Sequence, residues 1–434
     1  MIAPPLRRAG FGRITTLVLG TALLPLLAHA QQLTVSASRQ IYRAGETITW
    51  QIALTGDVQQ PRYRLRSGGL ETAEWHELAL TASKATLTAP AGTTPGWQLL
   101  EVQGTAANGA EVKTFGGALI APEQITPAIP APADFDAFWT AKLAELAKIP
   151  LNPVATPGDS GREDVSYSLV RLDNLRGTHV EAQLARPKAG KKLPVLVIFQ
   201  WAGVYGLQKD WVLGRAAEGW LTLNVNAHDL PIGKPESFYQ DLAKTDFGNY
   251  PHIGNDDRET SYFLRMYLAC HRAVEYMATR PDWDGRTLVV MGASQGGLQA
   301  LVAAALNPRI TAALAEVPAG SDQLGPDVGR LAAYPTQLNQ TWDRDPAKVR
   351  AASLYYDVVN FAPRIHCPTL IGVGLIDTVV PPPGVYASFN QIQAPKEIVV
   401  MPRADHTSGH DPYLLRAEAW LKELQNGRPP PPVP

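Results

Sequence analysis

From Tyr167 onward, short apolar runs alternate with stretches of helical periodicity, and this alternation leaves the chain few possible folds. Runs that are apolar on both faces are typical of strands inside a parallel sheet, and the helical stretches provide the crossovers that parallel strands need. The order predicts an α/β fold with a mostly parallel sheet covered by helices on both faces. The expected strands are 168–171, 180–185, 195–201, 221–225, 287–291, 312–317, 370–373 and 397–401. The expected helices are 211–218, 261–279, 294–306, 384–392 and 413–424.

Residues 31–121 have a different pattern, with apolar residues at alternate positions and no helical period. Turn signals such as Ser67-Gly68-Gly69 separate the runs. Short strands at this spacing predict a small all-β sandwich of the immunoglobulin kind. Its tryptophans, Trp50, Trp75 and Trp97, fit either core packing or a sugar-stacking surface, and core packing is favoured.

The first 30 residues have the features of a secretory signal peptide. A positive start at Arg7 and Arg8 is followed by the apolar run 15–27 and by the small-x-small site Ala28-His29-Ala30. This pattern predicts cleavage after Ala30 and a secreted or periplasmic protein. The alternative, a membrane anchor, is disfavoured because a span needs ~20 apolar residues.

Proline-rich segments mark two further boundaries. Residues 122–132 predict a linker with an extended backbone. It leads into the α/β region, 133–426, which opens with an amphipathic helix at 134–149. The chain closes with a proline-rich tail at 427–434, whose sequence is typical of a loose polyproline segment.

Charge and cysteine content exclude several classes of function. The chain has 39 Lys and Arg against 40 Asp and Glu, so there is no basic surplus to bind nucleic acid or an anionic membrane. Cys270 and Cys367 are too few for a disulfide-dense scaffold or a thiolate-rich metal site, and whether they pair stays open. We therefore expect oxygen and nitrogen chemistry with no cofactor and no metal. The sequence does not indicate an oligomeric state.

One glycine-rich segment lies between an expected strand and an expected helix. The strand 287–291 runs into Gly292-Ala293-Ser294-Gln295-Gly296-Gly297 and then into the helix 294–306. A G-x-S-x-G pattern in this setting indicates a nucleophile elbow, in which a strained turn exposes the serine. Ser294 is therefore the expected nucleophile. The alternative is a glycine-rich helix start that only packs closely.

A serine nucleophile needs a base, and the base needs an acid that orients it. Where the elbow occurs, the chain order is serine, acid, histidine. Asp377 follows the strand 370–373, at the edge where parallel sheets hold ligands, although a turn-forming aspartate is the alternative. Two histidines after the last strand compete as base. His406 is favoured, because His410 directly precedes Asp411-Pro412, a helix start.

Attack by the serine would place negative charge on the substrate oxygen, which two preorganised donors must stabilise. One expected donor is the backbone N–H of Gln295. We expect the second, the backbone N–H of Val204, in the loop after the strand 195–201, for which an ordinary strand-to-helix turn is the alternative. The histidines before Asp377, His228 among them, break the expected order, so surface or core roles suit them better.

The elbow with Gln295 after the serine and the segment Gly374-Leu375-Ile376-Asp377 carry a family resemblance. Over about residues 132–424 the chain resembles the acetyl xylan esterases and cephalosporin C deacetylases of the α/β-hydrolase fold. Further shared segments are Phe135-Asp136-Ala137-Phe138-Trp139, Arg176-Gly177, Asn360-Phe361-Ala362, Cys367-Pro368 and Pro381-Pro382. The chain departs from the family at Thr178, in Ala202-Gly203-Val204 and at Thr407, where the family usually has Gln, His-Gly-Tyr and Glu.

The resemblance implies a secreted serine carboxylesterase that removes small acyl groups, chiefly acetyl, from carbohydrate such as acetylated xylan. Its implied partners are an acylated carbohydrate or a small ester, with no nucleic acid and no membrane after signal cleavage. One alternative is a serine peptidase of the prolyl oligopeptidase type, whose usual propeller would not fit in residues 31–121. Another is a catalytically inactive glycan-binding protein, which an intact Ser294, Asp377 and His406 disfavour.

Overall fold

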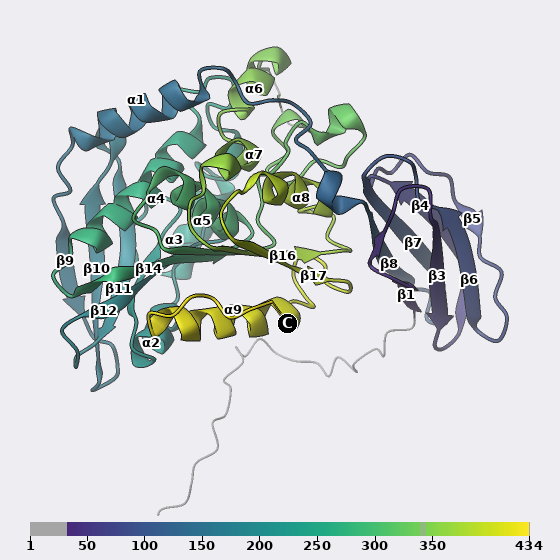
Figure 1. Cartoon of the computed structure of the whole chain (residues 1–434), viewed down its shortest axis with the longest axis horizontal. Helices are drawn as coiled ribbons and strands as arrows, with labels where there is room; N and C mark the ends of the chain where they lie inside the picture. The colour runs from purple at the N-terminus through teal and green to yellow at the C-terminus, as the bar shows by residue number, and fades with distance from the viewer. Residues whose placement is uncertain (1–32, 340, 342, 434) are drawn as a thin grey trace, which may run out of the picture.

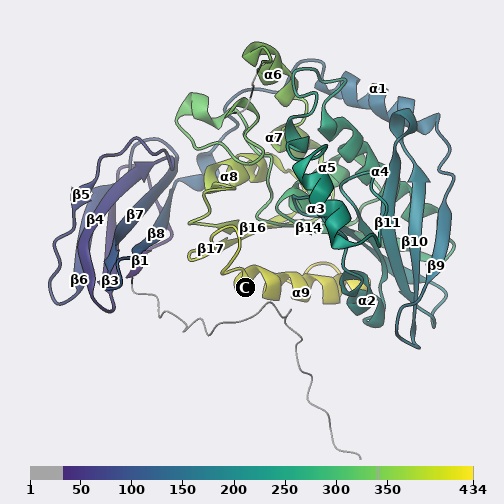
Figure 2. The same cartoon turned by 180° about the vertical axis from the view of Figure 1, so that it is seen from behind.

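The computed structural model describes residues 33–339, 341 and 343–433, so the predicted signal peptide lies outside the described residues. An all-β region, coloured purple in Figure 1, stands beside a larger region built around one nine-stranded sheet. Seen from behind in Figure 2, strands β9 (Val154–Gly158), β10 (Val165–Asp173) and β11 (His179–Pro187) lie at the edge of the large sheet that is farthest from the all-β region.

The N-terminal region is a β-sandwich, as the alternating pattern predicted. One sheet has the order β1-β3-β6 and the other β2-β8-β7-β4-β5, with all pairs antiparallel except β2 and β8. Trp50 and Trp97 are buried, which agrees with core packing, whereas the Trp75 ring contacts the guanidinium groups of Arg62 and Arg64. The strands are β1 Leu33–Ala37, β2 Ile41–Tyr42, β3 Thr47–Leu54, β4 Val58–Ser67, β5 His76–Glu77, β6 Lys84–Pro90, β7 Gly96–Ala106 and β8 Glu111–Ile120.

The large sheet has the order β17-β16-β15-β14-β12-β13-β11-β10-β9. Every pair from β17 to β13 is parallel, and the pairs formed by β11, β10 and β9 are antiparallel. The mostly parallel sheet of an α/β-hydrolase is thereby confirmed. The parallel strands are β12 Leu193–Phe199, β13 Leu221–Val225, β14 Trp283–Ala293, β15 Ala312–Glu316, β16 Thr369–Gly374 and β17 Lys396–Met401.

Helices cover both faces of this sheet. In Figure 1, α9 and α2 lie on one face, and α1, α4, α5 and α8 lie on the other. Among the described residues, each helix is too short or too polar to cross a bilayer. The helices are α1 Phe135–Ala147, α2 Asp210–Ala217, α3 Glu236–Lys244, α4 Tyr262–Thr279, α5 Gln295–Leu306, α6 Pro346–Ser353, α7 Val358–Phe361, α8 Pro382–Gln391 and α9 Asp411–Gln425.

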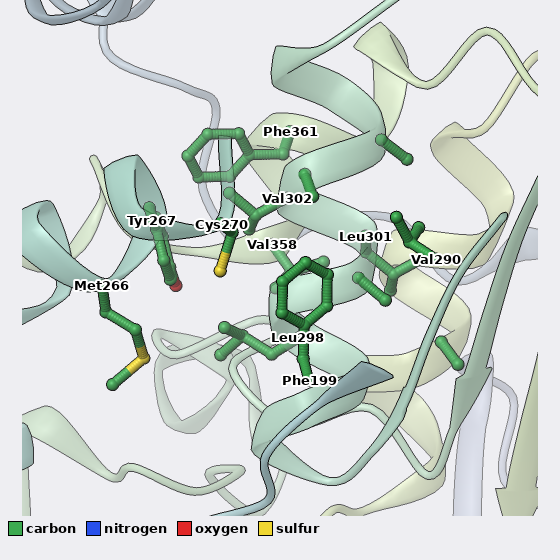
Figure 3. Packing of buried hydrophobic residues seen from close by; sticks show 14 of the residues in the cluster. Phe199, Met266, Tyr267, Cys270, Val290, Leu298, Leu301, Val302, Val358 and Phe361 are labelled. Atoms are coloured by element: carbon green, nitrogen blue, oxygen red, sulfur yellow. The ribbon is translucent and has the colours of Figure 1, made fainter. Parts of the chain in front are cut away.

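The helix α5 is the centre of the hydrophobic core. Figure 3 shows apolar side chains from α4, α7, β12 and β14 packed around it. Both cysteines are buried and free, and burial raises the pKa of the Cys367 thiol to about 12. Close packing on all sides makes α5 a rigid support for the residue at its N-terminus. The residues labelled in Figure 3 are Phe199, Met266, Tyr267, Cys270, Val290, Leu298, Leu301, Val302, Val358 and Phe361.

The sandwich is joined to the large region by a packed interface. Trp97 belongs to the same hydrophobic cluster as the core of the large region, and its indole Nε1 donates to the carbonyl of Leu375 at 3.0 Å. Gly117 lies so close to this loop that a Cβ there would be 1.9 Å from the Leu375 oxygen, so only glycine fits. The sandwich therefore supports the loop that carries Asp377.

The linker and the tail are both attached to the large region. The linker contains a turn of 3-10 helix at Pro122–Gln124, and the Asn390 amide donates to the carbonyls of Pro122 and Ile125 at 2.8 Å each. The tail predicted to be loose lies against α9, because Arg416 donates to the carbonyls of Pro431 and Pro432 at 2.7 Å each. A guanidinium group thus satisfies backbone acceptors that the proline run leaves unpaired.

Candidate active site

Ser294 lies at the sharp turn between β14 and α5. Its φ of 54° and ψ of −120° place a non-glycine residue in a strained region of backbone space. The turn is tight because Gly296 passes close to β12, where a Cβ would lie 2.4 Å from the carbonyl oxygen of Phe199. The Ser294 N–H donates to the carbonyl of Glu316 at 2.9 Å, which ties the turn to β15. The turn is thus held by backbone contacts on both sides.

The structure brings Ser294, His406 and Asp377 together. Ser294 Oγ lies 2.9 Å from His406 Nε2, and His406 Nδ1 lies 2.8 Å from Asp377 Oδ2. Asp377 is fully buried, and its other oxygen accepts the N–H groups of Val379 and Val380 at 2.8 Å each. A carboxylate can only accept, so Nδ1 carries the proton in this pair and Nε2 is left to accept from the serine hydroxyl.

His410 has different partners. Its Nδ1 lies 2.6 Å from Glu316 Oε1 and its Nε2 lies 2.8 Å from the carbonyl oxygen of Asp405. Both partners are acceptors, so both ring nitrogens donate, and the hydrogen bond to Glu316 raises the pKa of His410. A doubly protonated ring cannot accept the serine proton. His410 is also the N-cap residue of α9, one position before the helix start expected from the sequence.

The two expected oxyanion donors lie at the start of α5 and in the loop after β12. Among the described residues, neither the Gln295 N–H nor the Val204 N–H has a hydrogen-bond acceptor. The carbonyl of the Gly203–Val204 peptide accepts from His228 Nε2 at 3.0 Å. Since the C=O and N–H of a trans peptide point in opposite directions, the Val204 N–H is directed away from His228.

Tyr250 connects these two donor segments. Its hydroxyl donates to Gln295 Oε1 at 2.6 Å and accepts the Gly203 N–H at 3.3 Å. The hydroxyl of Tyr334 lies 3.0 Å from that of Tyr250 and extends the network to the cavity wall. Sequence reasoning missed Tyr250, because no motif surrounds it and it lies 45 residues from Gln295 in the chain. The one signal was the unusual composition of Ala202-Gly203-Val204.

His228 holds the Val204 loop from the core. Its ring is buried, with the Tyr262 hydroxyl 2.5 Å from Nδ1 and the Gly203 carbonyl 3.0 Å from Nε2. Burial lowers the pKa of His228 to about 4, so the neutral ring accepts at Nδ1 and donates at Nε2. The core position agrees with the expectation from the sequence, but the contact with the loop could not be predicted.

We expect His228 to make stability depend on pH. Its pKa is about 4 in the fold and about 6.5 when unfolded, so the unfolded chain binds the extra proton first as pH falls. The group should reduce the free energy of unfolding by about 2 kcal/mol between about pH 7.5 and about pH 5. Urea unfolding at both pH values should show a loss about 2 kcal/mol larger in wild type than in His228→Gln, because His252 and His271, whose pKa values burial also lowers, contribute equally to both proteins. The exposed His366 offers the control His366→Gln, which should behave as wild type. Equal pH slopes in wild type and His228→Gln would contradict the assignment.

The cavity beside Ser294 measures about 460 Å³, which is an ordinary volume for a small-molecule site. Ala202, Val317 and Val379 form an apolar part of its lining, and Ser294 also lines it. Thr407 lines it where the related family usually has Glu. Among the described residues there is no cluster of side chains that could hold a metal ion.

Comparison with known proteins identifies the family. A profile of the acetyl xylan esterase family (AXE1) matches residues 122–424, more than half of the chain. The chain belongs to this family. Its membership confirms the resemblance seen in the sequence and makes the protein a carboxylic ester hydrolase of the carbohydrate esterase kind. The sandwich lies outside the matched residues.

Individual acetyl xylan esterase relatives agree with this assignment. The chain is 37% identical to the acetyl esterase Axe7A of Xylanibacter ruminicola over 309 residues. The aligned segment covers 70% of this chain and 69% of that protein. Acetyl xylan esterase 1 from Thermoanaerobacterium sp. JW/SL YS485 is 26% identical with a TM-score of 0.60, covering 70% of this chain and 97% of that one. The acetyl xylan esterase from Paenibacillus sp. R4, at 24% identity and a TM-score of 0.60, shares the fold over 70% of this chain and 98% of its own.

Proposed function

We propose that the protein is a secreted or periplasmic serine esterase that removes acetyl groups from carbohydrate such as acetylated xylan. The observation that carries the proposal is the hydrogen-bonded series from Asp377 through His406 to Ser294, beside a cavity, in a member of a carbohydrate esterase family. Export is proposed on residues 1–30, whose pattern is that of a signal peptide.

In the proposed first step, Ser294 Oγ attacks the acetyl carbonyl carbon. The hydroxyl proton passes to His406 Nε2, the Oγ–C bond forms, and the carbonyl electron pair moves onto oxygen. Asp377 stabilises the imidazolium that results. Because the Asp377 carboxylate is held by two backbone N–H groups, it keeps His406 oriented without accepting its proton.

The Gln295 and Val204 N–H groups are the proposed donors to the oxyanion. Neither N–H group has an acceptor in the part of the chain that the structure describes, and hydrogen bonds fix both loops. Both observations support this role, since donors held before reaction need no reorganisation. The tetrahedral intermediate collapses by breaking the bond to the sugar oxygen, which takes the proton from His406. Water then attacks the acetyl-Ser294 by the same steps, and acetate leaves with regeneration of the hydroxyl.

The walls of the cavity favour a small acyl group. Ala202, Val317 and Val379 provide apolar surface for a methyl group.

Acetate release tests this function. We expect the purified enzyme to release acetate from acetylated xylan and to hydrolyse p-nitrophenyl acetate faster than p-nitrophenyl butyrate, in keeping with its family and with its acetyl esterase relative. A peptide anilide should be left intact. Cleavage of the anilide without acetate release would instead identify a peptidase, and activity on none of these substrates would contradict the proposal.

A further inference from the structure

Trp201 is unusually exposed for its size and type. It shows 45% of its surface, more than any other Trp, Tyr or Phe side chain among the described residues. It follows Gln200 in the loop after β12 and lines the cavity beside Ser294. A large apolar ring left in water next to a candidate catalytic group indicates a ligand contact, because exposed apolar surface costs free energy that binding would recover.

Two other aromatic rings support Trp201. Tyr205 lies at 5.4 Å between ring centroids with 30° between the planes, and Trp211 of α2 lies at 4.8 Å with a tilt of 57°. The Tyr205 hydroxyl also donates to the Trp201 carbonyl at 3.1 Å. The indole is thus held in place before any ligand arrives, which reduces the entropy lost on binding.

Trp201 also lines a second cavity, of about 360 Å³, on the α2 side. Ala293, the residue before Ser294, is shared by both cavities, so the second one adjoins the first at the elbow. Trp211 lines only the second cavity of the two. A ligand that extends from the ester bond at Ser294 would therefore reach the aromatic group next.

The polar lining of the second cavity selects a neutral ligand rich in hydroxyl groups. Asp210, Glu218 and Glu316 contribute carboxylates. One oxygen of Glu218 is paired with Arg215 and one of Glu316 with His410, and the remaining oxygens can accept hydrogen bonds from hydroxyl groups and repel anions. The one cation in the lining, Arg215, is already paired with Glu218 and Glu418. Pyranose rings fit this combination, because their C–H faces pack on aromatic rings while their hydroxyl groups donate outward.

We propose that Trp201 and Trp211 form a binding subsite for the sugar chain that carries the ester. The subsite rests on the proposed function and deepens it, since it assigns the residues that would bind the sugar chain beside the ester bond. The chain would stack on Trp201 while one acetyl group enters the cavity beside Ser294.

The test compares a long and a small substrate in the same variants. Trp201→Ala and Trp211→Ala should lower kcat/KM for acetylated xylohexaose, relative to p-nitrophenyl acetate, by about tenfold or more, which corresponds to about 1.4 kcal/mol of binding. Trp201→Phe should retain most of the ratio, because a ring remains. Trp75→Ala removes a tryptophan of the sandwich that contacts Arg62 and Arg64; it is the matched control and should leave the ratio unchanged. Ratios within twofold of wild type in both alanine variants would overturn the subsite.

A binding experiment separates failure of the subsite from failure of the proposed function. Unacetylated xylohexaose should quench or shift the tryptophan fluorescence of Ser294→Ala and bind at least about tenfold more weakly when Trp201→Ala is added. If wild type released no acetate from acetylated xylohexaose, the proposed function would fail, while binding that depends on Trp201 would still support the subsite. Absence of binding to Ser294→Ala would overturn the subsite.

Discussion

Ser294→Ala is expected to lower kcat for p-nitrophenyl acetate by about 10⁴-fold or more, because the variant has no oxygen to form the acyl-enzyme. The residual rate would come from the oxyanion donors and from binding alone. The hydroxyl bonds only to His406 among the described residues, so the fold should not depend on it. Steady-state kinetics give the first result, and thermal unfolding within about 1 °C of wild type gives the second.

A matched serine controls for the substitution itself. Ser237, exposed on α3, lies outside the cavity beside Ser294, and Ser237→Ala should keep full activity. If Ser294→Ala kept a tenth of wild-type turnover, Ser294 would not be the nucleophile and the proposed mechanism would fail.

The elbow could be predicted because its requirements are local. A buried strand, a G-x-S-x-G turn and a helix follow one another in the chain, and the close approach of Gly296 to Phe199 explains why glycine is needed there. The same holds for the parallel strands, whose apolar runs reflect burial on both faces. The antiparallel edge strand β9 was missed, because every residue of it is exposed and it has no apolar pattern.

The support around the candidate oxyanion donors could not be predicted, because it depends on contacts between distant segments. Tyr250 and His228 reach Gly203 from 47 and 25 residues away, and no spacing rule connects them. The contact of Trp97 with Leu375 spans 278 residues. The sequence pattern placed Trp97 in a buried position but could not show that its indole N–H would reach the Asp377 loop.

His406→Ala is expected to reduce kcat/KM by about 10⁴-fold or more, since within the part of the chain that the structure describes no other base is hydrogen-bonded to Ser294 Oγ. The second histidine of the loop is the matched control. His410→Ala should retain activity within about tenfold, because its ring donates from both nitrogens and cannot take the serine proton. The two variants measured on p-nitrophenyl acetate separate these roles, and the reverse result would make His410 the base.

We expect His410→Ala to affect the stability of the fold. His410→Ala leaves Glu316 without its ring partner, so the free energy of unfolding should fall by about 1–3 kcal/mol. The folded pKa of His410 is raised, so its contribution is fully present below the ordinary imidazole pKa and is lost as pH rises through the raised value. The deficit of His410→Ala should therefore be larger at about pH 6 than at about pH 9. An equal deficit at both pH values would show that the ring acts through packing alone. Because this pH dependence concerns folding, it separates a structural histidine from a catalytic one even where both variants lose some activity.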